Sequence, residues 1–298
     1  MTKKSRSIGT VPAAAASCLL VALLAGCVGV QQTVPQPEQP EPGSSESPEA
    51  PAPEVDAEPA FAIEDFDFGN AEWLFVPYAE SHPTLSLEIV DGAAEIDGMA
   101  YTVVAEETLF SDADGDGDLD ALVPIEAYGG GNTIDRQWYI WANADEGAVQ
   151  VGLPVARSLH CGTFTENIAA VDGGFEIHEF RRTIGEESLA CIEPGSDERV
   201  RTVGISPEGP AGELWPVQLA PFRAFGGICP APIEYHAYPL EVDVYAAPSE
   251  ASEPLSAGEM HEWQVDPWPV YAIPFDDYAL IGVSAEGGLG CAWGRKAA

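Results

Sequence analysis

Short segments in which apolar and polar residues alternate recur between residues 85 and 182, and they constrain the fold more than any other feature. Successive side chains of a β-strand point to opposite faces, so this alternation predicts strands with one buried face. The pairs Asp91-Gly92 and Asp97-Gly98 are typical of tight hairpin turns. The predicted strands cover residues 85–90, 99–107, 122–128, 137–143, 148–156, 162–171 and 175–182.

Helical periodicity is weak by comparison. Residues 63–75 are the only fair candidate for a short helix, because no other segment keeps a 3.6-residue apolar period. The sequence therefore predicts a mainly β protein. We expect an antiparallel β-meander domain over residues 61–206 and a small, barrel-like β unit over residues 207–298. The boundary is placed there because the sequence pattern changes after residues 205–213.

The first 27 residues have the form of a secretory signal. A positive head with Lys3, Lys4 and Arg6 precedes a short apolar run that ends in Leu-Ala-Gly-Cys. This ending resembles the lipobox of bacterial lipoproteins, which implies that Cys27 is diacylated and becomes the first residue of the exported chain. The resemblance implies attachment to the extracytoplasmic face of the cell membrane. The alternative is an uncleaved membrane helix, although the apolar core at residues 13–24 is shorter than the about 20 residues that a span needs.

Residues 28–60 predict a disordered stalk. Residues 30–60 contain eight prolines, many glutamates and no aromatic residue, so they cannot bury enough apolar surface to fold. Proline keeps such a chain extended at about 3.1 Å per residue. We expect this segment to hold the folded part away from the membrane surface.

The chain is strongly acidic. It has 12 basic and 49 acidic residues and a formal net charge of −37, and three of the basic residues precede Cys27. Such a surface repels nucleic acid and anionic lipid headgroups, which excludes both as expected partners. The acidity either confers solubility or favours binding of a cation or a basic partner.

Four cysteines follow Cys27. An even number of cysteines in an exported chain predicts two disulfides, for which three connectivities exist. We expect Cys161 to pair with Cys191 and Cys229 with Cys291, because each bond then lies within one proposed unit. A zinc cluster is the alternative, but the chain lacks Cys-x-x-Cys and a histidine pair at ligand spacing.

One loop carries aspartate at every second position. Its carboxylates are Asp112, Asp114, Asp116, Asp118 and Asp120, and Gly117 lies among them. Calcium requires several oxygen ligands from a short stretch, with glycine at the sharp turn. The helix–loop–helix form of such a site needs glutamate at the twelfth position, where Val123 stands. That form is therefore excluded.

The loop instead resembles the D-x-D-x-D-G-x-x-D loop of FG-GAP and VCBS-type repeats, which joins two strands. The resemblance implies that Asp112, Asp114, Asp116 and Asp120 bind one structural Ca²⁺ through side chains and Asp118 through its carbonyl. No second copy occurs, so a multi-bladed propeller is excluded. A solvated acidic turn is the alternative interpretation.

The C-terminal residues have short motifs of a second family. The stretch "YAAPS", a following L-x-x-G-E turn and a late "WGR" are similar to bacterial Src-homology-3-like domains of cell-envelope proteins, over about sixty residues. The central Gly-Trp strand of that family is replaced by "DPWPVY". An irregular extension of the first sheet, held by its own disulfide, is the alternative.

Motifs of several common enzyme classes are missing. The chain has no G-x-S-x-G, H-E-x-x-H or Walker loop, and we expect it not to be an enzyme. The glycine cluster at residues 129–131 is interpreted as a flexible connection or as the rim of a binding site. The Arg181-Arg182 doublet is expected to pair with neighbouring acidic residues.

Three function classes follow. The first is a non-catalytic, membrane-anchored surface lipoprotein that binds a ligand or protein partner at the envelope. The second is a peptidoglycan-binding module, which an exposed aromatic groove around Trp268 and Trp293 would favour. The third is a secreted hydrolase, which would need a nucleophile within hydrogen-bond reach of His160 or His178. The sequence favours the first.

Overall fold

Residues 57–298 form one compact unit with a mainly β, antiparallel fold, as the sequence predicts. The computed structural model describes residues 61–77, 84–131, 133–144, 147–230, 238–256, 260–263, 277–285 and 288–295. Helical structure in this part of the chain is limited to three single 3₁₀ turns. These are η1 (Ile63–Asp65), η2 (Phe68–Asn70) and η3 (Ala105–Glu107). None of the described helices is long and apolar enough to cross a membrane.

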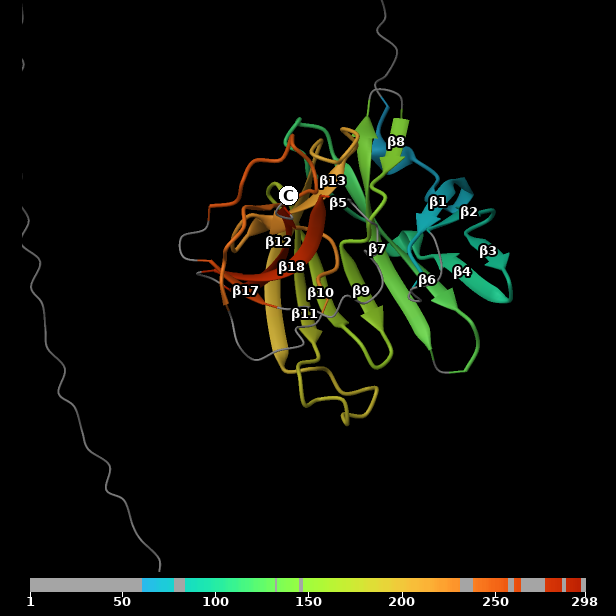
Figure 1. Cartoon of the computed structure of the whole chain (residues 1–298). Helices are drawn as coiled ribbons and strands as arrows, with labels where there is room; N and C mark the ends of the chain where they lie inside the picture. The colour runs from blue at the N-terminus through green and yellow to red at the C-terminus, as the bar shows by residue number, and fades with distance from the viewer. Residues whose placement is uncertain are drawn as a thin grey trace, which may run out of the picture. The chain divides into compact units, whose positions relative to one another are not determined.

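The largest sheet follows the order β3-β4-β6-β7-β8, with β5 paired to β6 and β9 to β7 (Figure 1). Its strands are β3 (Ala93–Ile96), β4 (Met99–Val103), β5 (Leu109–Ser111), β6 (Asp120–Tyr128), β7 (Ile134–Ala144), β8 (Gly147–Gln150) and β9 (Ala156–Leu159). The Asp-Gly turns are confirmed: Asp91 and Asp97 both have positive φ, and each glycine follows in the left-handed region. The short strand β3 lies between these turns and was not predicted.

The expected helix at residues 63–75 is wrong. Residues 72–75 form β1 (Glu72–Phe75), which pairs with β2 (Leu85–Glu88) after the turns η1 and η2. Trp73 and Phe75 are buried while Glu72 and Leu74 are not, so this segment has a strand period of two. The aromatic residues whose spacing suggested one face of a helix lie instead in 3₁₀ turns and a strand.

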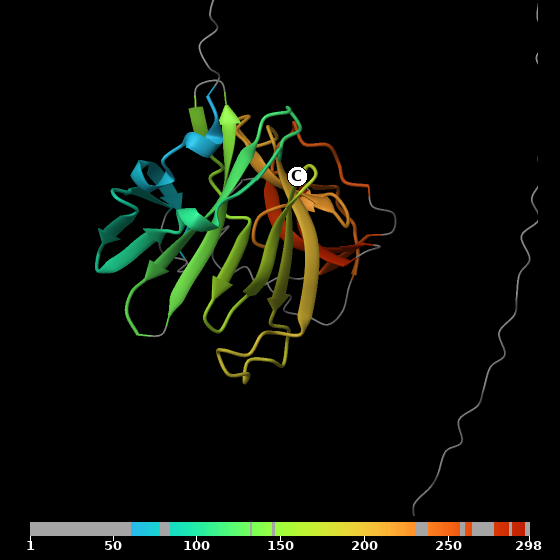
Figure 2. The same cartoon turned by 180° about the vertical axis from the view of Figure 1, so that it is seen from behind.

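A second sheet follows the order β10-β11-β12-β13-β14. Its strands are β10 (Phe164–Val171), β11 (Gly174–Arg181), β12 (Asp197–Ser206), β13 (Trp215–Ala220) and β14 (Ala224–Phe225). Thr165 of β10 donates its amide to the Ser158 hydroxyl and its own hydroxyl to the Arg157 carbonyl of β9. Figures 1 and 2 both show β7, β9, β10, β11 and β12 side by side, so the two large sheets form a continuous curved surface.

A third sheet contains the C-terminal strands in the order β15-β17-β18-β19-β16. These are β15 (Tyr238–Pro239), β16 (Val244–Tyr245), β17 (His261–Trp263), β18 (Tyr278–Ala285) and β19 (Gly288–Arg295). The expected domain boundary at residue 207 lies between β12 and β13, which are paired neighbours in the second sheet. Trp215 and Phe225 of that sheet pack against Trp293 of the third, so the residues on both sides of the boundary share a core.

The central strands β6 and β7 are buried on both faces. Val123 and Tyr139 belong to one apolar cluster, which also contains Trp73 and Phe75 of the β1–β2 pair. Leu122 and Ile140 belong to a second cluster on the opposite face. Because alternate residues of one strand enter different clusters, the predicted period of two is preserved although both faces are buried at the strand centres; exposed residues such as Tyr128 and Ile134 lie at the strand ends.

Candidate functional site

The aspartate loop joins β5 to β6 as the tip of a hairpin, with Ser111 paired to Asp120 at its base. The carboxylate of Asp112 accepts the amides of Gly115 (2.7 Å) and Gly117 (3.1 Å). The glycines have φ values of 83° and 101°, a region that disfavours other residues. Glycine at these positions therefore lets the loop wrap around the Asp112 side chain.

Three of the predicted ligands lie together. Carboxylate oxygens of Asp112, Asp114 and Asp116 are all within 4.8 Å of one another. Calcium–oxygen distances are about 2.3–2.6 Å, so oxygens on opposite sides of one ion are about 5 Å apart. The spacing of this triad is therefore compatible with shared coordination of one Ca²⁺. Asp118, whose side chain is exposed, is not part of this cluster.

Asp120 has a different environment from the triad. It is 1% exposed, and its carboxylate accepts the amides of Ala113 (2.7 Å) and Asn143 (2.9 Å). Burial raises the pKa of this carboxyl to about 6, with Asp114 and Asp116 adding to the increase and the two amides opposing it. Asp120 thereby attaches the loop to β7, and its carboxylate, like that of Asp118, is not part of the Asp112–Asp114–Asp116 group. The sequence pattern placed it among the ligands but did not show this second role.

The base of the loop is also attached to the second sheet. The Ala113 carbonyl accepts the amide of Ile205 (2.9 Å), and the Ser111 hydroxyl donates to the Val171 carbonyl (2.6 Å). A Cβ on Gly204 would lie 2.5 Å from the Ala113 carbonyl oxygen, so glycine is needed for this approach. An ion bound in the loop would therefore stabilise the junction of two sheets.

A cavity of about 450 Å³ lies at the other end of β4, β6 and β7, next to the β1–β2 pair. Its walls are mainly apolar: Phe75, Leu85, Ile96, Met99, Ala127 and Leu159. Four polar residues also line it: Asp97, Tyr101, Thr133 and Asp135. Small-molecule sites commonly have this volume and this combination of apolar walls with a few polar groups.

The glycine cluster after β6 lies at this cavity. Gly129 and Gly130 line it together with Thr133, whereas Gly131 does not. A Cβ on Gly129 would lie 2.4 Å from the Met99 sulfur, so a larger residue would displace a wall of the cavity. The glycine at this position permits close packing of the rim against β4.

A buried polar network supports one wall of the cavity. Arg157 binds the Asp135 carboxylate through both Nε (2.7 Å) and Nη2, and Gln137 Nε2 donates to the same carboxylate (3.0 Å). Gln137 also donates to the Val76 carbonyl (2.8 Å) and accepts the Tyr139 hydroxyl (2.6 Å). The network joins β7 and β9 to the end of β1, so it holds the wall formed by β1 in place.

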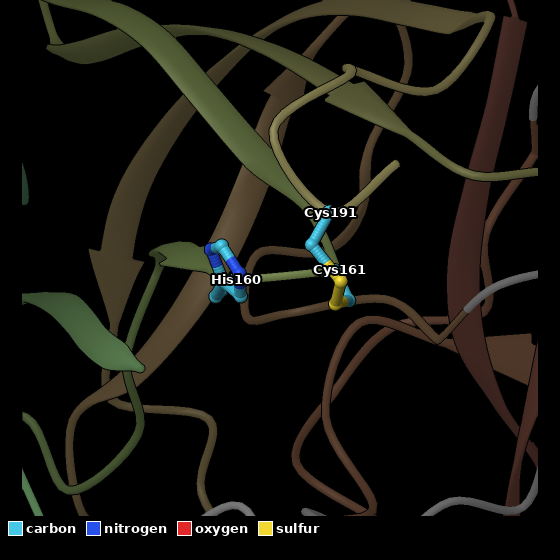
Figure 3. Close-up of side chains that lie close together, drawn as sticks. All are labelled: His160, Cys161 and Cys191. Carbon is cyan, nitrogen blue, oxygen red and sulfur yellow. A yellow bond between two sulfur atoms is a disulfide. The ribbon is translucent and has the colours of Figure 1, made fainter. Parts of the chain in front are cut away.

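The two disulfides have the predicted pairing, Cys161 with Cys191 and Cys229 with Cys291. The first is at the surface, and Figure 3 shows His160 beside it. The second joins residue 229, just after the second sheet, to β19 of the third sheet, and Cys291 is fully buried. This bond therefore links the second and third sheets, and both of its cysteines lie within residues 207–298 as predicted.

The other candidate residues have mainly structural contacts. His178 lies between Glu166 (Nδ1 to carboxylate, 2.9 Å) and Glu198 (Nε2 to carboxylate, 3.0 Å), so both of its ring nitrogens face carboxylates. Trp293 is 1% exposed and belongs to the core, whereas Trp268 lies outside the described residues. The exposed aromatic groove expected around this pair therefore does not include Trp293.

Of the arginine doublet, Arg181 is buried and Arg182 is partly exposed. Arg181 pairs with Asp197 (2.9 Å) and donates to the Cys229 carbonyl (2.6 Å), as its expected pairing with acids requires. Arg182 instead donates to main-chain carbonyls, including that of Ala190 (2.6 Å).

Comparison with known proteins gives no match to a family model, to a curated protein or to a solved structure. Cys27, the signal and the stalk lie outside the described residues, as do parts of the Src-homology-3-like motifs. The lipidation site, calcium binding by the aspartate loop and the three family resemblances stay predictions.

Proposed function

We propose that this chain is a non-catalytic lipoprotein that binds a small ligand at the extracytoplasmic face of the cell membrane. Cys27 carries the lipid anchor, residues 28–60 form a stalk, and the β unit presents the ligand cavity. The aspartate loop binds one Ca²⁺ whose role is structural. No nucleic acid takes part, because the surface charge opposes it.

The observation that carries this proposal is the cavity at the end of β4, β6 and β7. Its volume of about 450 Å³ can hold a compact organic molecule. A ligand that removes the apolar walls from water lowers the free energy of the system, which favours binding. The polar network around Asp135 holds the β1 wall of the cavity in place, so the site is preformed. A preformed site loses less conformational entropy when a ligand binds.

The cavity can be tested with the neutral apolar dye Nile red. The protein used is the exported chain from residue 27, with Cys27→Ser so that no lipid or detergent competes for the dye. We expect dye fluorescence to rise on binding, and Thr133→Trp to abolish the rise, because Thr133 is an exposed residue at the cavity mouth. Thr102→Trp is the matched control, because Thr102 is exposed on β4 next to Tyr101 and does not line the cavity.

Equal dye binding by both tryptophan variants would place the dye elsewhere and remove the support for a ligand cavity. Loss of binding in Thr133→Trp alone, with unchanged thermal unfolding, supports it. The two substitutions add the same side chain to exposed positions, so only the blocked cavity distinguishes them.

The ion is tested separately. The three carboxylates, whose oxygens lie within 4.8 Å of one another, repel one another when folded, and a cation removes that repulsion. Calcium that binds only the folded state at a hundredfold excess over its Kd stabilises it by about 2.7 kcal/mol. Thermal unfolding with millimolar calcium and with chelator should therefore differ, and Asp116→Ala should remove the difference. Asp67→Ala, which removes an aspartate that caps η2, should preserve it.

A further inference from the structure

We propose that the cavity takes a small organic cation, in which an apolar or aromatic body carries a protonated amine or a quaternary ammonium group. This inference rests on the proposed ligand-binding function and names the ligand class of the same cavity. It follows from three properties of the lining residues: their aromatic rings, one hydroxyl that forms no hydrogen bond with another described residue, and the sign of their charges.

The aromatic rings are those of Phe75 and Tyr101. Their ring centroids are 5.1 Å apart and the planes meet at 71°, an edge-to-face arrangement in the cavity wall. Faces of aromatic rings attract cations, and the attraction increases where water is excluded. Leu85, Ile96 and Met99 complete an apolar surface that suits the hydrocarbon part of such a ligand.

The hydroxyl of Tyr101 forms no hydrogen bond with another described residue. The Tyr101 side chain is mostly buried, but its hydroxyl is not one of the fully buried unpaired polar atoms, so it is open to the cavity that the residue lines. Burial, together with Asp135 and Asp97, raises the pKa of this phenol, so it stays neutral. A neutral phenol can accept a hydrogen bond from an ammonium group, so a bound cation would replace water at this hydroxyl.

The charges at the cavity are acidic. Asp97 and Asp135 are its only ionisable residues apart from Tyr101 among the described residues that line it. Asp135 is neutralised by Arg157, whereas the exposed Asp97 has no ion pair in the described part of the chain. Asp97 and a net charge of −37 repel a carboxylate or phosphate and attract a cation.

The charge preference can be measured with three ligands that share one body: phenylbutylamine, phenylbutanol and phenylpentanoate. Calorimetric titration uses the same chain as the dye experiment, at low ionic strength. We expect the amine to bind about two- to fivefold more tightly than the alcohol, the size of an exposed charge interaction, and the carboxylate to bind most weakly. Molar salt should remove the difference between the amine and the alcohol, because it screens charges.

Two variants test the assigned residues. Asp97→Asn should lower amine affinity to that of the alcohol, while Glu95→Gln should not, because Glu95 is an exposed acid nearby that does not line the cavity. Tyr101→Phe should lower the affinity for the amine about two- to tenfold, the usual range for one hydrogen bond. Thr133→Trp should abolish binding of all three ligands.

The outcomes separate this inference from the function on which it rests. If all three ligands bind equally and Thr133→Trp blocks them, the cavity binds apolar molecules but the cation preference is wrong. If the carboxylate binds best, the charge assignment is also wrong. If none of the three binds, both the ligand class and the cavity proposal are overturned.

Discussion

Replacement of Asp135 by alanine should destabilise the protein more than any exposed ion-pair change. In the native structure Arg157 and Asp135 have side chains that are 5% and 10% exposed, and two guanidinium nitrogens contact the carboxylate. Asp135→Ala leaves that buried guanidinium without its carboxylate. Removing one partner of a buried pair costs about 3–5 kcal/mol, because the remaining charge is desolvated and uncompensated.

The effect is large enough to measure by thermal unfolding. In domains of about 150–250 residues, 1 kcal/mol changes Tm by about 2–4 °C, so Asp135→Ala should lower Tm by roughly 6–20 °C. Glu250→Ala is the control, because it breaks the pair with Arg295 at the surface, where the side chains are 82% and 49% exposed. Exposed pairs contribute about 0–1 kcal/mol, so the control should change Tm little.

The double variant Asp135→Leu with Arg157→Met provides a second check. It removes both charges and substitutes apolar side chains, so it should recover a large part of the lost stability. If Asp135→Ala lowers Tm no more than Glu250→Ala, the buried pair does not stabilise the cavity wall. If the double variant is less stable than the single one, the uncompensated charge is not the cause.

Three further predictions concern the loop, the disulfides and the anchor. The Asp120 pKa of about 6 lies above its usual 3.8, so the contribution of its protonated form is fully present below pH 3.8 and lost as pH rises through 6. With chelator present, chemical unfolding gives the free energy of unfolding of the unchanged protein and of Asp120→Asn. The difference between the two should change by on the order of 3 kcal/mol to the disadvantage of the unchanged protein between pH 3.8 and about 6. A constant difference would contradict the raised pKa. Reduction should destabilise the chain by about 4 kcal/mol per disulfide, since the loops span 30 and 62 residues; unchanged urea unfolding after verified thiol release would rule this out. Cys27→Ala should abolish metabolic lipid labelling, and persistent labelling would exclude the lipobox.

Sequence periodicity was a good guide to the central strands. Strands β4, β6, β7, β10 and β11 lie where alternation and Asp-Gly turns predict them, because local side-chain direction follows the backbone period. The segment at residues 63–75 was wrong because closely spaced aromatic residues look alike on a helix and across two 3₁₀ turns and a strand. Short strands such as β3 and β14 lack enough residues to show a period.

Of the two candidate sites, the aspartate loop could be predicted from the sequence and the cavity could not. The aspartate spacing and its glycines are local properties, so the grouping of Asp112, Asp114 and Asp116 could be anticipated from a short stretch. The cavity could not be anticipated in the same way. Phe75, Tyr101, Asp135 and Leu159 line it together although long stretches of chain separate them.

The sequence by itself determined the β class, the turns and the compact acidic loop, because each depends on neighbours along the chain. Cysteine number indicated two disulfides but left three connectivities, of which the structure has the expected one. Only the tertiary structure decided that the second sheet continues across residue 207 and that Asp120 joins the loop to β7. It also showed that Arg157 neutralises Asp135 beneath a cavity. These features depend on pairing between distant strands, which bury polar groups and create a concave surface that no local pattern encodes.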